Sequence, residues 1–468
     1  MCLDTTVTTS GEDKLLDFTV KHSYLRNMLR PLILALTVIL GKTQDRISYD
    51  NHYLVNLKVA NERDIDEFNR VLAKEQAHCQ SLQVDLSEGS HDFLCQHHEE
   101  RNGLVHELHQ SQIPFEVESQ SMRELLLSEK QPESRNAIPI SSKFNYNKYP
   151  RFQEIVNHLN TIEKENPGVV RNERVGATHE NRSLILTTIG NSPMGQDTRA
   201  VWIDAGIHAR EWISPITALF LIDRIAEEFR KEPYQQDQRI VGVDWYFMPI
   251  SNPDGYEYSH ETDRMWRKNR APPPKGESCY GVDLNRNWDV IGFGIGASND
   301  ACKDNFKGTK ANSEPEVRAA SKKLLSVKKN VRVALSLHSA GQYWLTSWGY
   351  KTQLPVDNDK MVSLGKKAAD AIFRTSGRRY KVGSAGALLY PAGGASDDFA
   401  KARALIPYAA TIELPGSHGK RRFVLPASQI RSVGEEMFAA MGVVAEVARN
   451  HPLGDDPSLM EEAKRNNG

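Results

Sequence analysis

Residues 200–229 read AVWIDAGIHAREWISPITALFLIDRIAEEF, and this stretch predicts both the class of the fold and the place of its chemistry. Residues 200–205 form a short apolar run with β-branched and aromatic side chains, which is typical of a buried strand. Apolar residues then recur at helical spacing over 216–229, and we expect Ser214 to be the N-cap and Pro215 the first helical residue. The stretch therefore predicts a strand, a polar turn and a helix.

Four other segments are short, apolar and bounded by Gly, Pro or Asn, as buried strands are. They are 184–189, 245–250, 331–337 and 409–414. Another helix is predicted at Ser313-Glu314-Pro315-Glu316, which has the spacing of a capping box. Alternating strands and helices indicate an α/β fold, with a mixed, largely parallel sheet and helices on both faces.

The segment before residue 136 differs in charge from the rest of the chain. Residues 46–135 hold 9 Lys and Arg against 17 Asp and Glu, a net charge of −8, whereas the whole chain carries −1. Its pattern predicts strand, helix, strand, strand, helix, strand, the order of a small α+β, ferredoxin-like unit. These elements are 53–59, 63–75, 82–86, 92–96, 99–110 and 113–118. A short helix at 122–130 leads into a polar linker ending at Arg135, which suits cleavage by a trypsin-like protease.

Composition limits the function classes. The chain has 468 residues, 39% hydrophobic and 25% charged, which is typical of globular proteins and excludes a disordered chain. Its balance of 59 Lys and Arg against 60 Asp and Glu provides no broad positive field, so we expect no nucleic-acid partner. Five cysteines are too few for a scaffold built from disulfides.

A basic residue and a short apolar run follow Met28, as in a secretory signal. Residues 32–40 are too short to cross a bilayer as a helix, which needs about 20 residues. We therefore expect translation to start at Met28 and the protein to be secreted and extracellular, without a stable membrane anchor. A buried helix or a short signal anchor is the alternative.

Three predicted strands carry side chains that can bind a metal or move a proton. His208 and Glu211 follow the strand at 200–205, His338 follows the strand at 331–337, and Glu413 lies in the last strand. Ligands of open α/β sheets bind outside the carboxyl ends of the strands. Two histidines and one glutamate, with a fourth position open, are a ligand set of catalytic zinc. The H-x-x-E pattern alone is more often an exposed pair in a loop. The surrounding sequence must therefore indicate whether His208 and Glu211 bind a metal.

That surrounding sequence resembles the pancreatic-type zinc metallocarboxypeptidases, the carboxypeptidase A and B family, over about residues 140–450. The motifs that carry the resemblance are HAREWISP (208–215), NPDGY (252–256), MWRKNR (265–270), VDLNRNW (282–288), SLHS (336–339), YPAGG (390–394) and TIELP (411–415).

The resemblance implies a role for each matching residue. The zinc ligands, one Zn²⁺ per chain, would be His208, Glu211 and His338. Catalysis would use Glu413 as general base and Arg267 to stabilise the oxyanion, while Asp283 would hold the first histidine. The substrate-binding residues would be Asn285, Arg286, Tyr390, Arg210 and Arg264. The resemblance also implies a disulfide between Cys279 and Cys302, whereas Cys79 and Cys95 either pair or stay free.

The resemblance places Asp397 at the base of the specificity pocket. An acid there implies a B-like preference for C-terminal Lys or Arg, and the small Ala385 is compatible with it. Gly349 instead matches the A-type pattern, so a preference for aromatic or aliphatic C-terminal residues is an alternative. A non-catalytic peptide-binding relative and a metal-dependent deacylase are the other hypotheses.

The expected organisation has four parts. Residues 1–43 are an upstream extension and signal, 44–135 an inhibitory pro-domain, 136–450 the zinc carboxypeptidase domain and 451–468 a polar tail. We expect a monomeric zymogen whose partners are peptides with a free C-terminus and a trypsin-like activating protease.

Overall fold

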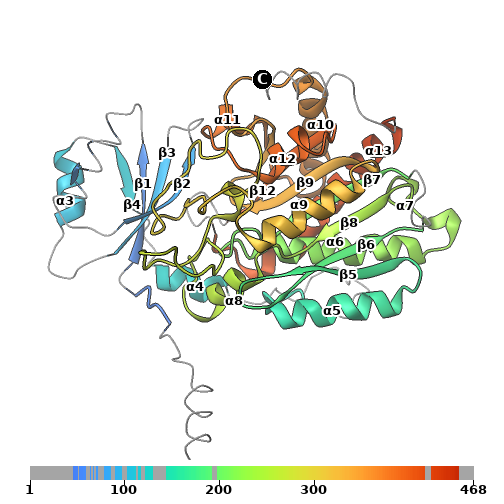
Figure 1. The fold of residues 1–468 in the computed structure, drawn as a ribbon, viewed down its shortest axis with the longest axis horizontal. Coiled ribbons are helices and arrows are strands. Elements are labelled where there is room, and N and C mark those ends of the chain that lie inside the picture. The colour runs from blue at the N-terminus through green and yellow to red at the C-terminus, as the bar shows by residue number, and fades with distance from the viewer. Residues whose placement is uncertain are drawn as a thin grey trace, which may run out of the picture. The chain divides into compact units, whose positions relative to one another are not determined.

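The structure of this chain is a computed structural model (Figure 1). It describes part of the chain. The described residues are 46–50, 52–58, 64, 67, 70–71, 79–85, 90–96, 103–111, 114–117, 122–129, 144–191, 198–416 and 423–452. The predicted start at Met28, the signal segment, the cleavage site at Arg135 and nearly all of the tail lie outside them. None of the helices in the described part combines the length and apolar character that a bilayer span needs.

A mixed sheet of eight strands, in the order β11-β10-β12-β9-β7-β8-β6-β5, lies at the centre of the larger part. The strands are β5 (Val170–Ala177), β6 (Ser183–Ile189), β7 (Ala200–Ala205), β8 (Asp244–Met248), β9 (Val331–Ser339), β10 (Tyr343–Thr346), β11 (Lys381–Ser384) and β12 (Tyr408–Leu414). Strands β12, β9, β7 and β8 are parallel neighbours, and antiparallel pairs flank them. The prediction of a mixed, largely parallel sheet is confirmed.

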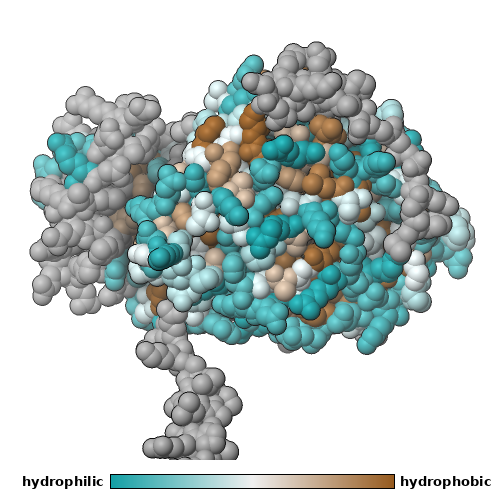
Figure 2. Space-filling model, in the orientation of Figure 1, coloured by the Kyte–Doolittle hydropathy of each residue, from teal (hydrophilic) through white to brown (hydrophobic). Residues whose placement is uncertain are grey.

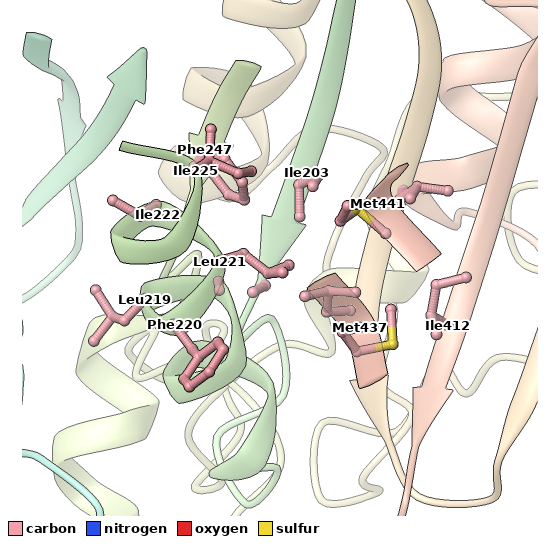
Figure 3. Packing of buried hydrophobic residues seen from close by; sticks show 14 of the residues in the cluster. Ile203, Leu219, Phe220, Leu221, Ile222, Ile225, Phe247, Ile412, Met437 and Met441 are labelled. Carbon is pink, nitrogen blue, oxygen red and sulfur yellow. The ribbon is translucent and has the colours of Figure 1, made fainter. Parts of the chain in front are cut away.

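Helices cover both faces of this sheet. They are α5 (Phe152–Glu165), α6 (Ile213–Arg230), α7 (Gln238–Val241), α8 (Pro253–Glu261), α9 (Pro315–Val327), α10 (Asn358–Ser376), α11 (Ala385–Leu388), α12 (Ser396–Ala402) and α13 (Ile430–Asn450), with short 3₁₀ turns η1 (Pro233–Gln235), η2 (Leu284–Arg286) and η3 (Ala427–Gln429). Alternate residues of β7 point into two cores. Ile203 packs with α6 and with Met437 and Met441 of α13 (Figure 3), whereas Trp202 packs with Leu324 of α9.

The face of the molecule that Figure 2 shows is mostly polar. The coloured residues on the face drawn in Figure 2 are largely hydrophilic, and hydrophobic atoms show only in small areas between them.

The two predicted helix caps are wrong. Helix α6 begins one residue before Ser214, and the Ser214 hydroxyl instead accepts a hydrogen bond from Gly206 N at 2.9 Å and donates to Leu337 O. At α9 the N-cap is Glu314, not Ser313, and the Ser313 hydroxyl donates to the Glu314 carboxylate at 2.7 Å. In both cases the serine hydroxyl that was expected to cap the helix instead forms hydrogen bonds with a neighbouring segment or side chain.

A second, smaller sheet lies in the N-terminal segment. Its antiparallel strands are β1 (His52–Lys58), β2 (Cys79–Asp85), β3 (Ser90–Gln96) and β4 (Phe115–Val117), in the order β2-β3-β1-β4, with α3 (Gly103–Gln110) and α4 (Met122–Glu129). The strands and α3 follow one another in the predicted order, while most of the predicted helix at 63–75 lies outside the described residues. Cys79 and Cys95, directly opposite each other on β2 and β3, form a disulfide, as do Cys279 and Cys302.

Candidate active site

Two imidazoles and one carboxylate meet at the carboxyl ends of β7 and β9. His208 follows β7 through the turn at Gly206, whose φ of 63° favours glycine. His208 Nδ1 lies 2.7 Å from Glu211 Oε1 and 3.2 Å from His338 Nδ1, and His338 Nδ1 lies 3.3 Å from Glu211 Oε2. All three side chains are buried. The fold thus brings together the three predicted ligands.

These atoms have the separations that one zinc ion requires. Tetrahedral ligands about 2.1 Å from zinc are about 3.4 Å from one another, close to two of the measured distances. The other ring nitrogen of His208, Nε2, is 3.2 Å from Asp283 Oδ1. A carboxylate in that place orients a metal-binding histidine. The donor set therefore fits zinc and leaves a fourth position for water or substrate.

Neighbouring cations keep the two carboxylates of this cluster ionised. Burial opposes ionisation, but the two imidazoles lower the pKa of Glu211. Burial also opposes ionisation of Asp283, yet Arg267 and then Arg286 lower its pKa well below the ordinary value. Arg267 donates to Asp283 Oδ2 from Nε at 3.0 Å and from Nη2 at 2.9 Å. Asp283 consequently fixes both His208 and Arg267.

Glu413 lies beside His338 in the parallel pairing of β12 with β9. Its Oε2 is fully buried and accepts no hydrogen bond from the described residues. Burial, together with the negative charge of Glu211, raises the pKa of Glu413 to about 7. A carboxyl group with a pKa near neutrality can both accept and release a proton at neutral pH.

The turn η2 presents an amide beside a guanidinium. Asn285 Oδ1 accepts a hydrogen bond from Ser396 N at 3.0 Å, so Nδ2 is the group left to donate. Arg286 Nη2 donates to the Tyr390 hydroxyl at 3.1 Å, and its Nε is buried without a partner among the described residues. Donors of this kind match the planar shape of a carboxylate.

These groups line one cavity. The predicted site residues in its wall are His208, Glu211, Arg267, Asn285, Arg286, His338, Tyr390, Asp397 and Glu413. Asp397 is 4% exposed, and its Oδ2 has no partner among the described residues. Burial raises the pKa of Asp397 to about 6. The cavity therefore has metal-ligand atoms in one part of its wall and a buried carboxyl group with one unpartnered oxygen in another.

The next residue, Asp398, shapes the wall near Asp397. Its carboxylate accepts hydrogen bonds from Gly349 N at 2.9 and 3.1 Å and from Tyr350 N at 3.0 Å. Gly349 and Ala385 both line the cavity, and neither carries a long side chain. These two positions of the wall therefore project little into the cavity.

Arg210 and Arg264 are not in the wall of this cavity but are buried beside it. Arg210 Nη2 donates to Leu82 O of β2 at 3.3 Å, and its guanidinium lies 4.4 Å from the centre of the Phe423 ring. Arg264 forms an ion pair with Glu129 of α4. Both arginines are thus covered by the N-terminal unit.

The cavity wall also contains residues that were not predicted, among them Leu82, Leu345, Leu389 and Phe423. Leu82 belongs to β2, more than a hundred positions before His208. The strand pattern predicted that Leu82 lies in a strand, but no local signal indicates which surface that strand contacts. Phe423 follows the last recognised motif and belongs to no motif itself.

Comparisons with known proteins agree with this site. The zinc carboxypeptidase family matches residues 155–440 of the chain. Carboxypeptidase B of Astacus astacus is 37% identical over 302 residues, 64% of this chain and 97% of that protein. Carboxypeptidase A2 of Rattus norvegicus is 37% identical over 311 residues, 66% of this chain and 72% of that protein.

A solved structure extends the likeness to the fold. The crystal structure of thrombin activatable fibrinolysis inhibitor superposes with a TM-score of 0.75 at 28% identity, covering 86% of this chain and all of that one. Members of the matched family are hydrolytic metallopeptidases with one catalytic zinc. On the family match and the donor set together, the chain belongs to the zinc carboxypeptidase family and is a zinc-dependent enzyme.

Proposed function

We propose that this protein is a secreted zymogen that, once cut, removes C-terminal Lys or Arg from peptides. The observation that carries the proposal is the shared cavity, whose wall holds the metal-ligand atoms, the donors of η2 and the unpartnered Oδ2 of Asp397. A peptide would enter with its terminal carboxylate at η2 and its last side chain toward Asp397.

In this proposal His208, Glu211 and His338 hold the zinc ion. When bound, zinc polarises a carbonyl and lowers the pKa of water to about 7. Glu413 takes a proton from the attacking water and later passes it to the leaving amine. Its pKa of about 7 suits both transfers.

Three side chains would orient the peptide. Asn285 and Arg286 bind the terminal carboxylate, which restricts cleavage to the last peptide bond. Tyr390, now hydrogen-bonded to Arg286, would exchange that bond for a contact with the substrate. Arg267, held by Asp283, is placed to stabilise negative charge on the carbonyl oxygen, an effect of about 3 kcal/mol for one oxyanion donor.

The preference for Lys or Arg rests on Asp397. A buried carboxylate oxygen without a partner is costly, by about 1–3 kcal/mol, and a cationic side chain would satisfy it. An aliphatic side chain would leave it unsatisfied. Gly349 supports the alternative A-like preference, and the relatives above include both a carboxypeptidase B and a carboxypeptidase A2 at equal identity.

The N-terminal unit would act as an inhibitory pro-domain. Leu82 lines the cavity, Gln80 donates to Asp304 at 2.7 Å, and Glu129 pairs with Arg264. These contacts support the proposal that β2 and α4 block the approach of a peptide. Cleavage at Arg135 by a trypsin-like protease would release them, and the released enzyme would act as a monomer.

Trypsin treatment of the purified chain tests the proposal. Peptides ending in Arg, Lys, Phe or Leu would be incubated with the cut and uncut chain, with and without a zinc chelator. We expect chelator-sensitive release of Arg and Lys from the cut chain alone. Release of Phe and Leu instead would favour the A-like alternative, and no release of any residue would contradict the enzyme's proposed activation.

A further inference from the structure

A second group of metal-ligand side chains lies at the start of helix α9. His179, Glu314 and Glu316 each offer one ligand atom, and these atoms lie within 4.8 Å of one another. None of the three lines the active-site cavity. The cluster is therefore separate from the catalytic site.

His179 and Glu314 already have the spacing of two ligands of one ion. His179 Nε2 lies 2.9 Å from Glu314 Oε2. Ligand atoms about 2.1 Å from an ion are about 3.4 Å apart when the ion has four ligands and about 3.0 Å apart when it has six. The pair is close to the six-ligand value, in which water molecules would supply the remaining ligands. A hydrogen bond between the imidazole and the carboxylate gives a similar distance, so this pair alone does not indicate a metal ion.

Glu316 provides the independent observation. The residue is 1% exposed, and its Oε1 is fully buried without a hydrogen-bond partner among the described residues. Its other oxygen accepts one hydrogen bond, from Asn269 Nδ2 at 3.2 Å. The Oε1 atom therefore lacks a donor or cation to compensate it among the described residues. A divalent cation would satisfy this oxygen.

The cluster is also accessible and balanced in charge. The His179 side chain is 28% exposed, so an ion and its remaining water ligands can enter from solvent. With a neutral imidazole and two carboxylates as ligands, the cluster carries two negative charges, which a divalent ion would cancel.

We propose that His179, Glu314 and Glu316 bind a second, structural divalent cation. One imidazole with two carboxylates suits Zn²⁺ better than Ca²⁺, which prefers oxygen ligands alone.

Asn269 gives this cation site a role in the enzyme. Its Nδ2 donates to Glu314 at 2.7 Å, while its Oδ1 accepts from Val282 N at 2.8 Å and from Ala271 N at 3.2 Å. Asn269 thus joins the cluster to the two segments that carry Arg267 and Asp283. A bound cation would hold these two segments together from outside the cavity.

Zinc counting tests the proposal on the full chain. The protein would be stripped with a chelator, incubated with excess Zn²⁺, desalted and measured by mass spectrometry of the metal. We expect two zinc ions in the wild type, one in His179→Gln and one in His338→Gln, which removes a ligand of the catalytic site. His106→Gln, at an exposed histidine of α3, is the matched control and should retain two.

A second readout covers the case in which a variant folds poorly. Zn²⁺ should raise the melting temperature of His338→Gln, and adding Glu316→Gln to that variant should abolish the rise. One zinc ion in both the wild type and His179→Gln, or an unchanged rise in the double variant, would overturn the proposal. If instead the assignment of the catalytic zinc ligands is wrong, the zinc content of His338→Gln should equal that of the wild type.

Discussion

Glu129 of helix α4 and Arg264 form an ion pair whose side chains are 3% and 1% exposed. Arg264 Nε donates to Glu129 Oε2 at 3.0 Å, and the guanidinium lies 3.7 Å from the centre of the Trp212 ring. Removing one partner of a buried pair costs about 3–5 kcal/mol, because the other charge is left without compensation. The pair is therefore a strong attachment between the N-terminal unit and the catalytic part.

Glu129→Gln should weaken this attachment. We expect the uncut variant to release C-terminal Arg at least about 100-fold faster than the uncut wild type, since a loss of about 3–5 kcal/mol shifts the docking equilibrium more than 100-fold. After trypsin treatment the two proteins should have equal kcat/KM. Glu124→Gln, at an exposed position of the same helix, is the control. Equal rates of the uncut proteins would show that the pair does not restrain the N-terminal unit.

Glu413→Gln should remove the proposed general base and keep the shape of the side chain. We expect kcat to fall by about 10²–10⁴-fold, the range of general acid–base catalysis. Zinc content and melting temperature should change little, because Glu413 is not one of the three proposed ligands. Steady-state kinetics with metal analysis checks both points. A variant with more than half of the wild-type kcat would assign proton transfer to another group.

Asp397→Asn should reduce the preference for basic residues. The variant loses the charge that would pair with Lys or Arg, and truncating one partner of a buried charge pair costs about 2–5 kcal/mol. We expect kcat/KM for a peptide ending in Arg to fall at least about 30-fold, and kcat/KM for a peptide ending in Leu to stay level or rise. Equal losses on both peptides would mean that Asp397 supports the fold and does not select the substrate.

Acid should shift the substrate preference in the wild type. Burial raises the pKa of Asp397 to about 6, so the carboxylate loses its charge as the pH falls through that value. The ratio of kcat/KM for Arg over Leu peptides should therefore be level above pH 7 and fall about tenfold per pH unit well below pH 6. Taking the ratio cancels titrations common to both substrates, including that of Glu413. In Asp397→Asn the ratio should not vary with pH.

Metal removal should abolish activity reversibly. We expect less than about 1% of the activity to remain after 1,10-phenanthroline treatment and dialysis, since zinc supplies several kcal/mol of transition-state stabilisation. Titration with Zn²⁺ should restore activity, while Mg²⁺, which prefers oxygen ligands, should not. Full activity in a sample shown to be free of zinc would contradict the assignment of the three ligands.

The strands with a strong local signal could be predicted from the sequence. Ala200–Ala205 is a strand at the predicted residues because its side chains are apolar on both faces. The edge strand β5 and the short strands β10 and β11 were not predicted. Val170–Ala177 is largely polar because one side of an edge strand is open to solvent, so its pattern resembles that of a loop.

The site could be predicted where motifs carry it. The roles of His208 and His338 followed from residues at strand ends, but their 3.2 Å separation depends on the pairing of β7 with β9, which no local pattern fixes. The burial of Arg210 and Arg264 could not be predicted either. It results from contacts with Leu82 and Glu129, in segments far away along the chain.

The hydroxyl of Ser214 connects the ends of β7 and β9, because it binds Gly206 N on one side and Leu337 O on the other. These two residues lie next to the segments that present the two imidazoles. The distance across the proposed zinc ligands is thus set in part by a helix residue that never touches the ion. We expect substitutions at Ser214 to alter how tightly the metal is held before they alter whether the protein folds.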